Sequence, residues 1–125
     1  MKSSIVKDKS YAFALRTITL AGWLKGQKEF EIAGQILRSG TAIGSNVEEA
    51  LAGVSRADFI AKMSIASKEA RETHYWLRLL RDSKIVSESR IALLEKESLE
   101  LIRMLTAIVK TSQTSSASSK LKIKN

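Results

Sequence analysis

Glutamate and histidine side chains in the middle of the sequence are the ones whose types could support catalysis. They are Glu48, Glu49, Glu69, Glu72 and His74. Carboxylate-bridged di-metal bundles need a Glu-x-x-His motif on each of two helices, together with two further glutamates. Here the histidine follows Glu72 by two residues, which places it on the wrong helical face, and the sequence has no second histidine. This spacing argues against a di-metal oxidase.

General acid–base hydrolysis by Glu49, Glu69 and Glu72 is the other catalytic alternative, because crowded carboxylates can divide into an acid and a base. The sequence contains no cysteine. It offers no other activated nucleophile and no phosphate-binding glycine loop to complete such a site. We therefore expect no enzymatic activity, no cofactor and no bound metal.

The same polar residues fit a structural role, in which a partly buried hydrogen-bonded network fixes helix register or subunit pairing. A histidine beside such a network is most often a boundary side chain with one hydrogen bond. The residues predicted for the network or for a subunit interface are Asn46, Glu49, Arg56, Glu69, Glu72 and Trp76.

Residues 68–82 separate into faces when each residue is turned by about 100° around a helix axis. One side is mainly basic and carries Lys68, Arg71, Tyr75, Arg78 and Asp82, with His74 and Arg81 between it and the core. The other flank combines glutamates with large apolar side chains: Ile65, Glu69, Glu72, Trp76 and Leu79.

The net charge of +8 makes a polyanionic partner plausible, because contacts with phosphates release counterions. The competing interpretation of the charge is a soluble protein with a lysine-rich tail. The residues predicted to bind nucleic acid are Lys68, Arg71, Tyr75, Arg78, Arg81, Lys120, Lys122 and Lys124.

The elements that must position these residues are helices, because the apolar residues recur at helical spacing and the chain has no proline. We predict an all-α, antiparallel up-down-up-down four-helix bundle over residues 1–114. Residues 115–125, rich in serine and lysine, are predicted to form a disordered tail. The predicted helices cover residues 10–27, 29–54, 56–82 and 88–112.

Each predicted helix has one apolar stripe for the core. Ser55 and Asp58 suggest a capped start for the third helix, and Gly40 and Gly44 suggest a close helix contact. The first two stripes are Tyr11, Ala14, Ile18 and Ala21, and then Ile32, Ile36, Ile43, Val47, Ala50 and Val54. The last two are Phe59, Met63, Ala66, Ala70, Thr73, Leu77 and Leu80, and then Ile91, Leu94, Ser98, Leu101, Leu105, Ile108 and Ser112.

Second stripes on the two middle helices predict self-association, because one bundle cannot cover all of this surface. Trp76, Leu79 and Ile65 supply the apolar stripe. The alternative is a boundary tryptophan covered by a loop or by the chain ends. The small and polar stripe on the second helix is Gln35, Ser39, Ala42, Asn46, Glu49 and Gly53.

Residues 39–80 carry motifs of the form S-x-N-[IV]-x-E, R-x-[DE]-F and A-x-[KG]-[ES]-x-x-E, followed by a leucine-rich end. They are filled by Ser45, Asn46, Val47, Glu49, Arg56, Asp58, Phe59, Ala66, Glu69, Glu72, Leu77 and Leu80. This pattern resembles the four-helix bundle proteins encoded in intervening sequences of bacterial 23S rRNA genes, with Ala50 where a glycine is usual. The resemblance covers about residues 8–112.

This resemblance implies a four-helix bundle that assembles into a ring-shaped homopentamer with a central channel. Related bundles are accessory subunits of reverse transcriptases in diversity-generating retroelements, and no catalytic residues carry over. The resulting hypothesis is a cytoplasmic, non-enzymatic homo-oligomer, without membrane contact, that binds RNA or a ribonucleoprotein such as a reverse transcriptase through its basic outer surface. The alternative is a protein-interaction scaffold that docks on a polymerase or another enzyme without recognising nucleic acid.

Overall fold

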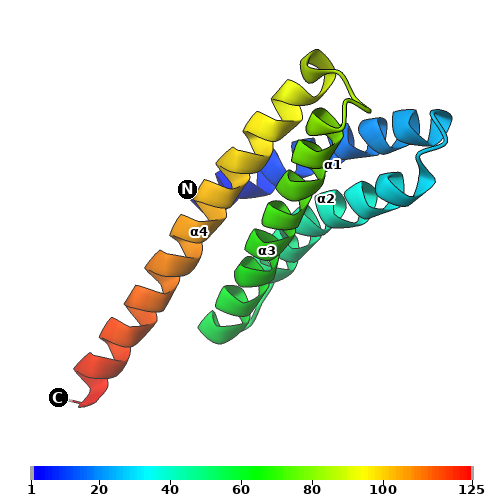
Figure 1. The fold of residues 1–125 in the computed structure, drawn as a ribbon. Coiled ribbons are helices and arrows are strands. Elements are labelled where there is room, and N and C mark those ends of the chain that lie inside the picture. The colour runs from blue at the N-terminus through cyan, green and yellow to red at the C-terminus, as the bar shows by residue number, and fades with distance from the viewer. Residues whose placement is uncertain (1, 125) are drawn as a thin grey trace.

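The computed structural model describes the backbone of residues 2–124 and the side chains of residues 3–115. The chain forms an up-down-up-down bundle in which each helix packs against its neighbours and the last returns to the first (Figure 1). This confirms the predicted all-α, four-helix architecture. The helices are α1 Lys2–Gly26, α2 Phe30–Leu51, α3 Arg56–Asp82 and α4 Glu88–Lys124.

The helix bounds differ from the predicted ones mainly at the two ends of the chain. α1 begins at Lys2, well before residue 10, and α2 ends at Leu51 rather than at residue 54. α3 occupies residues 56–82. α4 continues to Lys124, past its predicted end at residue 112. Disorder of residues 115–125 stays a prediction, because the side chains beyond residue 115 lie outside the described residues.

The start of α3 is fixed by the capping interaction that the sequence suggests. The backbone N–H of Asp58 donates to Ser55 Oγ at 3.1 Å, and Ser55 itself has extended backbone angles. Such a cap satisfies one of the N–H groups that the first turn of a helix leaves without a partner.

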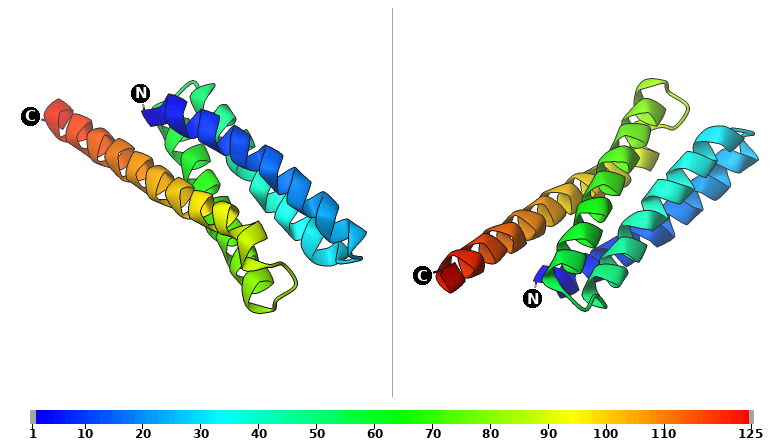
Figure 2. Two further views of the ribbon diagram at one scale, coloured as in Figure 1. Left: turned by 90° about the horizontal axis from the view of Figure 1, so that it is seen from above. Right: turned by 90° about the horizontal axis from the view of Figure 1, so that it is seen from below.

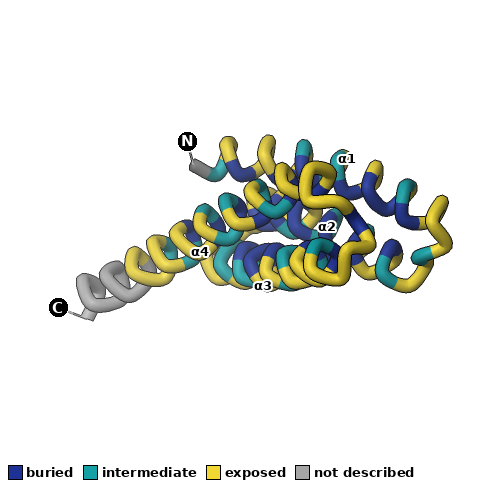
Figure 3. The backbone as a smooth tube through the Cα atoms, turned by 45° about the horizontal axis from the view of Figure 1, so that its top comes forward, coloured by how far each residue is buried: buried dark blue, intermediate teal, exposed yellow. Residues whose placement is uncertain are grey.

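The buried stripes of α3 and α4 follow the predicted periodicity, from Met63 to Leu80 and from Ile91 to Ile108. Figure 3 shows the buried positions along the sides where the helices face one another. At the ends of these stripes, Phe59 and Ser112 are only partly buried. The core of the bundle therefore lies where these two stripes predict it.

The predicted core stripe of α1 is wrong at Tyr11 and Ile18, and of its four members only Ala21 is buried, with Ala14 partly buried. Tyr11 and Ile18 are 60% and 50% exposed, whereas Phe13 is completely buried. Apolar residues occur on both sides of α1, so periodicity did not determine which side faces inward. Val54, predicted as core, is 96% exposed because it lies beyond the end of α2. The buried residues of α1 are Val6, Ser10, Phe13, Thr17, Leu20, Ala21 and Leu24.

The two glycines of α2 lie against α1, as predicted for a close helix contact. A Cβ atom added to Gly40 would come within 2.4 Å of Thr17 Cγ2, and one added to Gly44 within 3.4 Å of the Ser10 carbonyl oxygen. Small residues allow this approach, and α1 and α2 run side by side in both views of Figure 2.

α4 closes the bundle by packing extensively on α3 and less extensively on α1. In Figure 1, the C-terminal part of α4 extends away from the other three helices. Among the described residues, no helix combines the length and the apolar character needed to cross a membrane.

Candidate nucleic-acid interface

The outer side of α3 presents an exposed basic face, which we define as Lys68, Arg71, Tyr75 and Arg78. These residues recur at helical spacing on the side turned away from the buried stripe. Tyr75 is 46% exposed, and the guanidinium carbon of Arg78 lies 5.9 Å from the centre of its ring. Arg71 Nη2 donates to Thr106 Oγ1 on α4 at 3.0 Å. The structure therefore brings four of the predicted nucleic-acid-binding residues onto one surface.

No described carboxylate forms an ion pair with Lys68, Arg71 or Arg78. The positive charge of the basic face is therefore not compensated by ion pairs within the described part of the chain. A polyanion approaching this face would meet charged groups that are already exposed to water.

Arg81 differs from the rest of the predicted set, because its charge is balanced within the protein. Its Nη1 donates to Glu95 Oε2 at 2.6 Å and its Nε donates to Asp82 Oδ1 at 2.8 Å. The hydrogen bond from Arg81 also holds the pKa of Asp82 below its ordinary value. Arg81 thus joins α3 to α4. The side chains of Lys120, Lys122 and Lys124 lie outside the described residues.

Three of the four glutamates of α4, all except Glu88, are paired with basic residues of other helices. In addition to Glu95, Glu97 accepts from Arg16 Nε at 2.7 Å, and Glu100 accepts from Lys9 Nζ at 3.2 Å. Because these acids are neutralised locally, the excess positive charge of the described residues is concentrated on other surfaces, including the basic face.

His74 lies between the basic face and the core and contacts α4. Ser98 Oγ donates to the Glu95 carbonyl oxygen at 2.8 Å, so it accepts from His74 Nδ1–H at 2.9 Å. Burial lowers the pKa of His74, and the positive charges of Arg78 and Arg81 act in the same direction, whereas Glu95 opposes them. Loss of solvation makes the neutral ring the favoured form.

The other flank of α3 carries a polar cluster centred on Arg38 of α2. Arg38 Nη1 donates to Glu69 Oε2 at 3.1 Å, and its Nη2 donates to Glu72 Oε2. Trp76 Nε1 also donates to Glu72 Oε2, at 3.1 Å. The structure therefore brings together Glu69, Glu72 and Trp76 through an arginine that sequence reasoning did not include.

The remaining members of the predicted network lie elsewhere. Asn46 Nδ2 donates to the Ala42 carbonyl oxygen of its own helix at 2.9 Å. Glu49 lies 3.9 Å from Lys62 Nζ, and Arg56 lines an opening between α3 and α4. The predicted network is thus divided among four separate places, and only the Arg38 cluster joins two helices through several partners.

The position of Arg38 follows from a buried contact of its neighbour, which only the structure shows. Ser39 is completely buried and accepts from Thr73 Oγ1 at 2.9 Å, which fixes the register between α2 and α3. Arg38, one position earlier, must then lie at the edge of this contact, facing the acidic flank of α3. Among the described side chains, no three histidine, cysteine or carboxylate groups come together in a way that could hold a metal ion.

Comparison with known proteins agrees with this architecture. The family model described as 23S rRNA-intervening sequence protein matches residues 2–107. Among curated proteins, none matches the chain. The fold is similar, with a TM-score of 0.84 and 47% identity, to a crystal structure at 1.70 Å resolution of a protein with unknown function from the S23 ribosomal protein family of Bacteroides thetaiotaomicron VPI-5482. The match covers 88% of this chain and 99% of the other. The resemblance in the sequence motifs is therefore confirmed, and the chain belongs to the 23S rRNA-intervening sequence protein family.

Proposed function

We propose that this protein is a non-enzymatic, self-associating bundle that binds RNA, or an RNA–protein complex, through the basic face of α3. The observation that carries the proposal is the exposure of Lys68, Arg71 and Arg78 without carboxylate partners among the described side chains, although three of the four α4 glutamates are paired with other cations. Phosphate contacts of this kind give affinity with little sequence specificity. Tyr75 adds an exposed aromatic ring on which an unpaired base can stack.

Self-association would repeat the basic face on one particle, so that weak contacts add through effective concentration. It is supported by the apolar surface beside the Arg38 cluster, where Ile65 and Leu79 are each 40% exposed and Trp76 is partly buried. The sequence resemblance implies a pentamer, and a reverse transcriptase with its RNA is the kind of RNA–protein partner that it suggests.

The test is a salt titration of binding to a labelled RNA. Between about 50 and 200 mM salt, log K should fall linearly with log salt, with a slope that counts the phosphates in contact. R71E/R78E should weaken binding by at least about tenfold at low salt, because it removes and then reverses two contacts. K7E/K25E on α1 makes the same change of charge away from the basic face and serves as the control. A flat salt dependence, or no binding at low salt, overturns the proposal.

The second candidate function is a protein-interaction scaffold, and the exposed stripe on α1 favours it. Tyr11, Leu15 and Ile18 are spaced by four and three residues and are each at least half exposed. A surface of this kind suits an apolar protein partner. If Leu15→Lys abolishes capture of a polymerase partner while RNA affinity is unchanged, the scaffold is the better description.

A further inference from the structure

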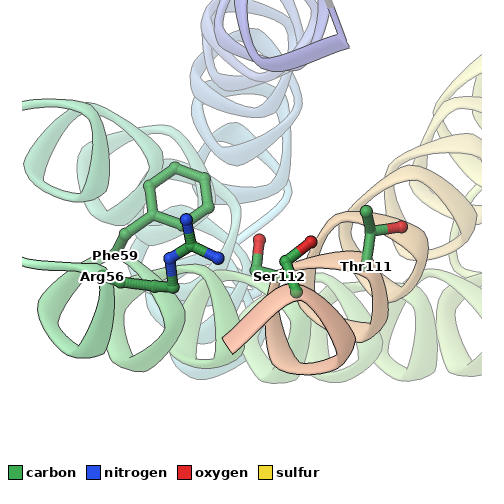
Figure 4. Close-up of a pocket in the computed structure, with 5 residues that line it drawn as sticks. Arg56, Phe59, Thr111 and Ser112 are labelled. Carbon is green, nitrogen blue, oxygen red and sulfur yellow. The ribbon is translucent and has the colours of Figure 1, made fainter. Parts of the chain in front are cut away.

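The groove between α3 and α4 contains two cavities along its length, next to the basic face. One opening, of about 430 Å³, is lined by Arg56 and Phe59 of α3 and by Thr111 and Ser112 of α4. Figure 4 shows these α3 and α4 residues on opposite sides of this opening. The second opening, of about 270 Å³, follows along the same two helices, from Ser64 to Arg71 on α3.

The described residues lining both openings are positively charged or neutral, without a carboxylate. Arg56, Lys68 and Arg71 contribute cations from α3, and Lys110 contributes one from α4. The ligand that fits these charges is an extended anion lying between the helices, because the cations come from both walls.

Most of the remaining lining residues carry hydroxyl or amide groups, and Phe59 and Val109 are the apolar members. Ser64 and Ser67 on α3 face Thr106 and Gln113 on α4 across the second opening. Such groups donate to phosphate oxygens and can both donate to and accept from a ribose 2′-hydroxyl. This combination of cations and short hydroxyl side chains matches a sugar–phosphate backbone better than it matches an acidic protein segment.

We propose that the α3–α4 groove binds the backbone of single-stranded RNA, from Arg56 at one end to Arg71 at the other. This inference rests on the proposed RNA-binding function and specifies the strand form and the position. The span from residue 56 to residue 71 is about 22 Å at the rise of an α-helix, which accommodates several nucleotides.

We expect a single strand rather than a duplex in this groove, because the two openings are small and an A-form duplex is wide and presents its phosphates on its outside. Phe59 lines one end of the groove, and Tyr75 follows Arg71 by one helical turn at the other. Aromatic rings can stack on bases only where those bases are unpaired.

The experiment compares an RNA of about 12 nucleotides, single-stranded and as a duplex, by fluorescence anisotropy with the full chain. The wild-type protein should bind the single strand at least about tenfold more tightly. R56Q/K110Q removes one cation from each wall and should lower the salt slope by about 1.4 for the single strand. The control K7Q/K25Q removes two cations from α1 and should leave the slope unchanged.

A second measurement uses the unmodified sequence and does not depend on how a variant folds. Bound single-stranded RNA should protect Lys68 and Lys110 from acetylation, while Lys7 and Lys25 react as in the free protein. Two results would overturn the proposal that the α3–α4 groove binds single-stranded RNA. One is equal affinity for duplex RNA, and the other is an unchanged salt slope in R56Q/K110Q together with an unprotected Lys110. If R71E/R78E still weakens binding by at least about tenfold in that case, the proposed function survives, whereas absence of any RNA binding removes both.

Discussion

Gly40 occupies the closest contact between α1 and α2. A Cβ atom there would lie 2.4 Å from Thr17 Cγ2 and 2.7 Å from Thr17 Oγ1. Thr17 is buried and its Oγ1 donates to the Phe13 carbonyl oxygen, so it cannot easily turn away. Gly40→Ala should therefore destabilise the protein by about 1–3 kcal/mol in urea unfolding, despite the better helix propensity of alanine.

Gly34 provides the matched control for this substitution. It lies in the same helix, is exposed, and has no atom within 4 Å of an added Cβ. Gly34→Ala should therefore stabilise the protein by about 0.5–1 kcal/mol. Equal effects at the two positions would show that the contact with Thr17 does not limit the packing of α1 on α2.

His74 predicts a pH dependence of stability. Its pKa is lowered from the ordinary value of 6.5 in the folded protein, mainly by burial. As the pH falls through 6.5, the unfolded chain therefore binds more protons, and the free energy of unfolding decreases until the folded-state pKa is passed.

The measurement is the urea midpoint between about pH 7 and pH 5.5, which covers this titration. His74→Gln removes the only histidine of the chain and should flatten the dependence. A wild-type midpoint that stays constant over this range would contradict the assignment.

At the scale of helices, the sequence predicts the buried stripes of α3 and α4 well because in each helix one apolar stripe is long and free of charged residues. In α3 this stripe runs from Met63 to Leu80, whereas the second stripe, with Trp76, is interrupted by Glu69 and Glu72. In α1 two apolar stripes compete, and the choice depends on how α2 and α4 pack against the helix. That information is non-local and cannot be obtained from the periodicity of α1.

In the candidate site, too, helical periodicity predicts some positions, whereas others depend on non-local packing. Lys68, Arg71 and Arg78 were placed on an outer face by angle alone, and they are exposed. The pairing of Arg81 with Glu95 and of Arg38 with Glu69 and Glu72 depends on helix register. Register is set by buried contacts such as that between Ser39 and Thr73, which the sequence does not reveal.

Substitutions on the two faces of α1 should differ in their effect on stability. Phe13→Ala should cost about 3–5 kcal/mol, because it empties a completely buried position. Ile18→Lys, on the half-exposed face, should change stability by about 0.5 kcal/mol or less at low protein concentration. Urea unfolding of the two variants measures the difference, and a larger loss for Ile18→Lys would mean that the outer stripe is buried in the folded protein.

At the scale of the whole molecule, the apolar surface beside the Arg38 cluster predicts self-association. Trp76→Glu should convert an oligomer to a monomer in light scattering at micromolar concentration, because it places a further carboxylate next to Glu72. Leu79→Glu, at a 40% exposed position on the same flank, should act similarly.

Leu93→Glu is the matched control for these two variants. It introduces the same charge at a 54% exposed leucine on α4 and should leave the oligomer intact. A wild-type protein that scatters as a monomer at these concentrations would exclude this assembly.

The link between α1 and α4 has a consequence for how the chain folds during synthesis. The ion pairs Arg16–Glu97 and Lys9–Glu100 connect residues 81 and 91 positions apart. The first three helices can therefore pack together before α4 is made, but these two contacts of α1 form only after residues 97–100 have been synthesised. Contacts of such wide sequence separation form slowly, so we expect the docking of α4 on α1 to be a late step of folding.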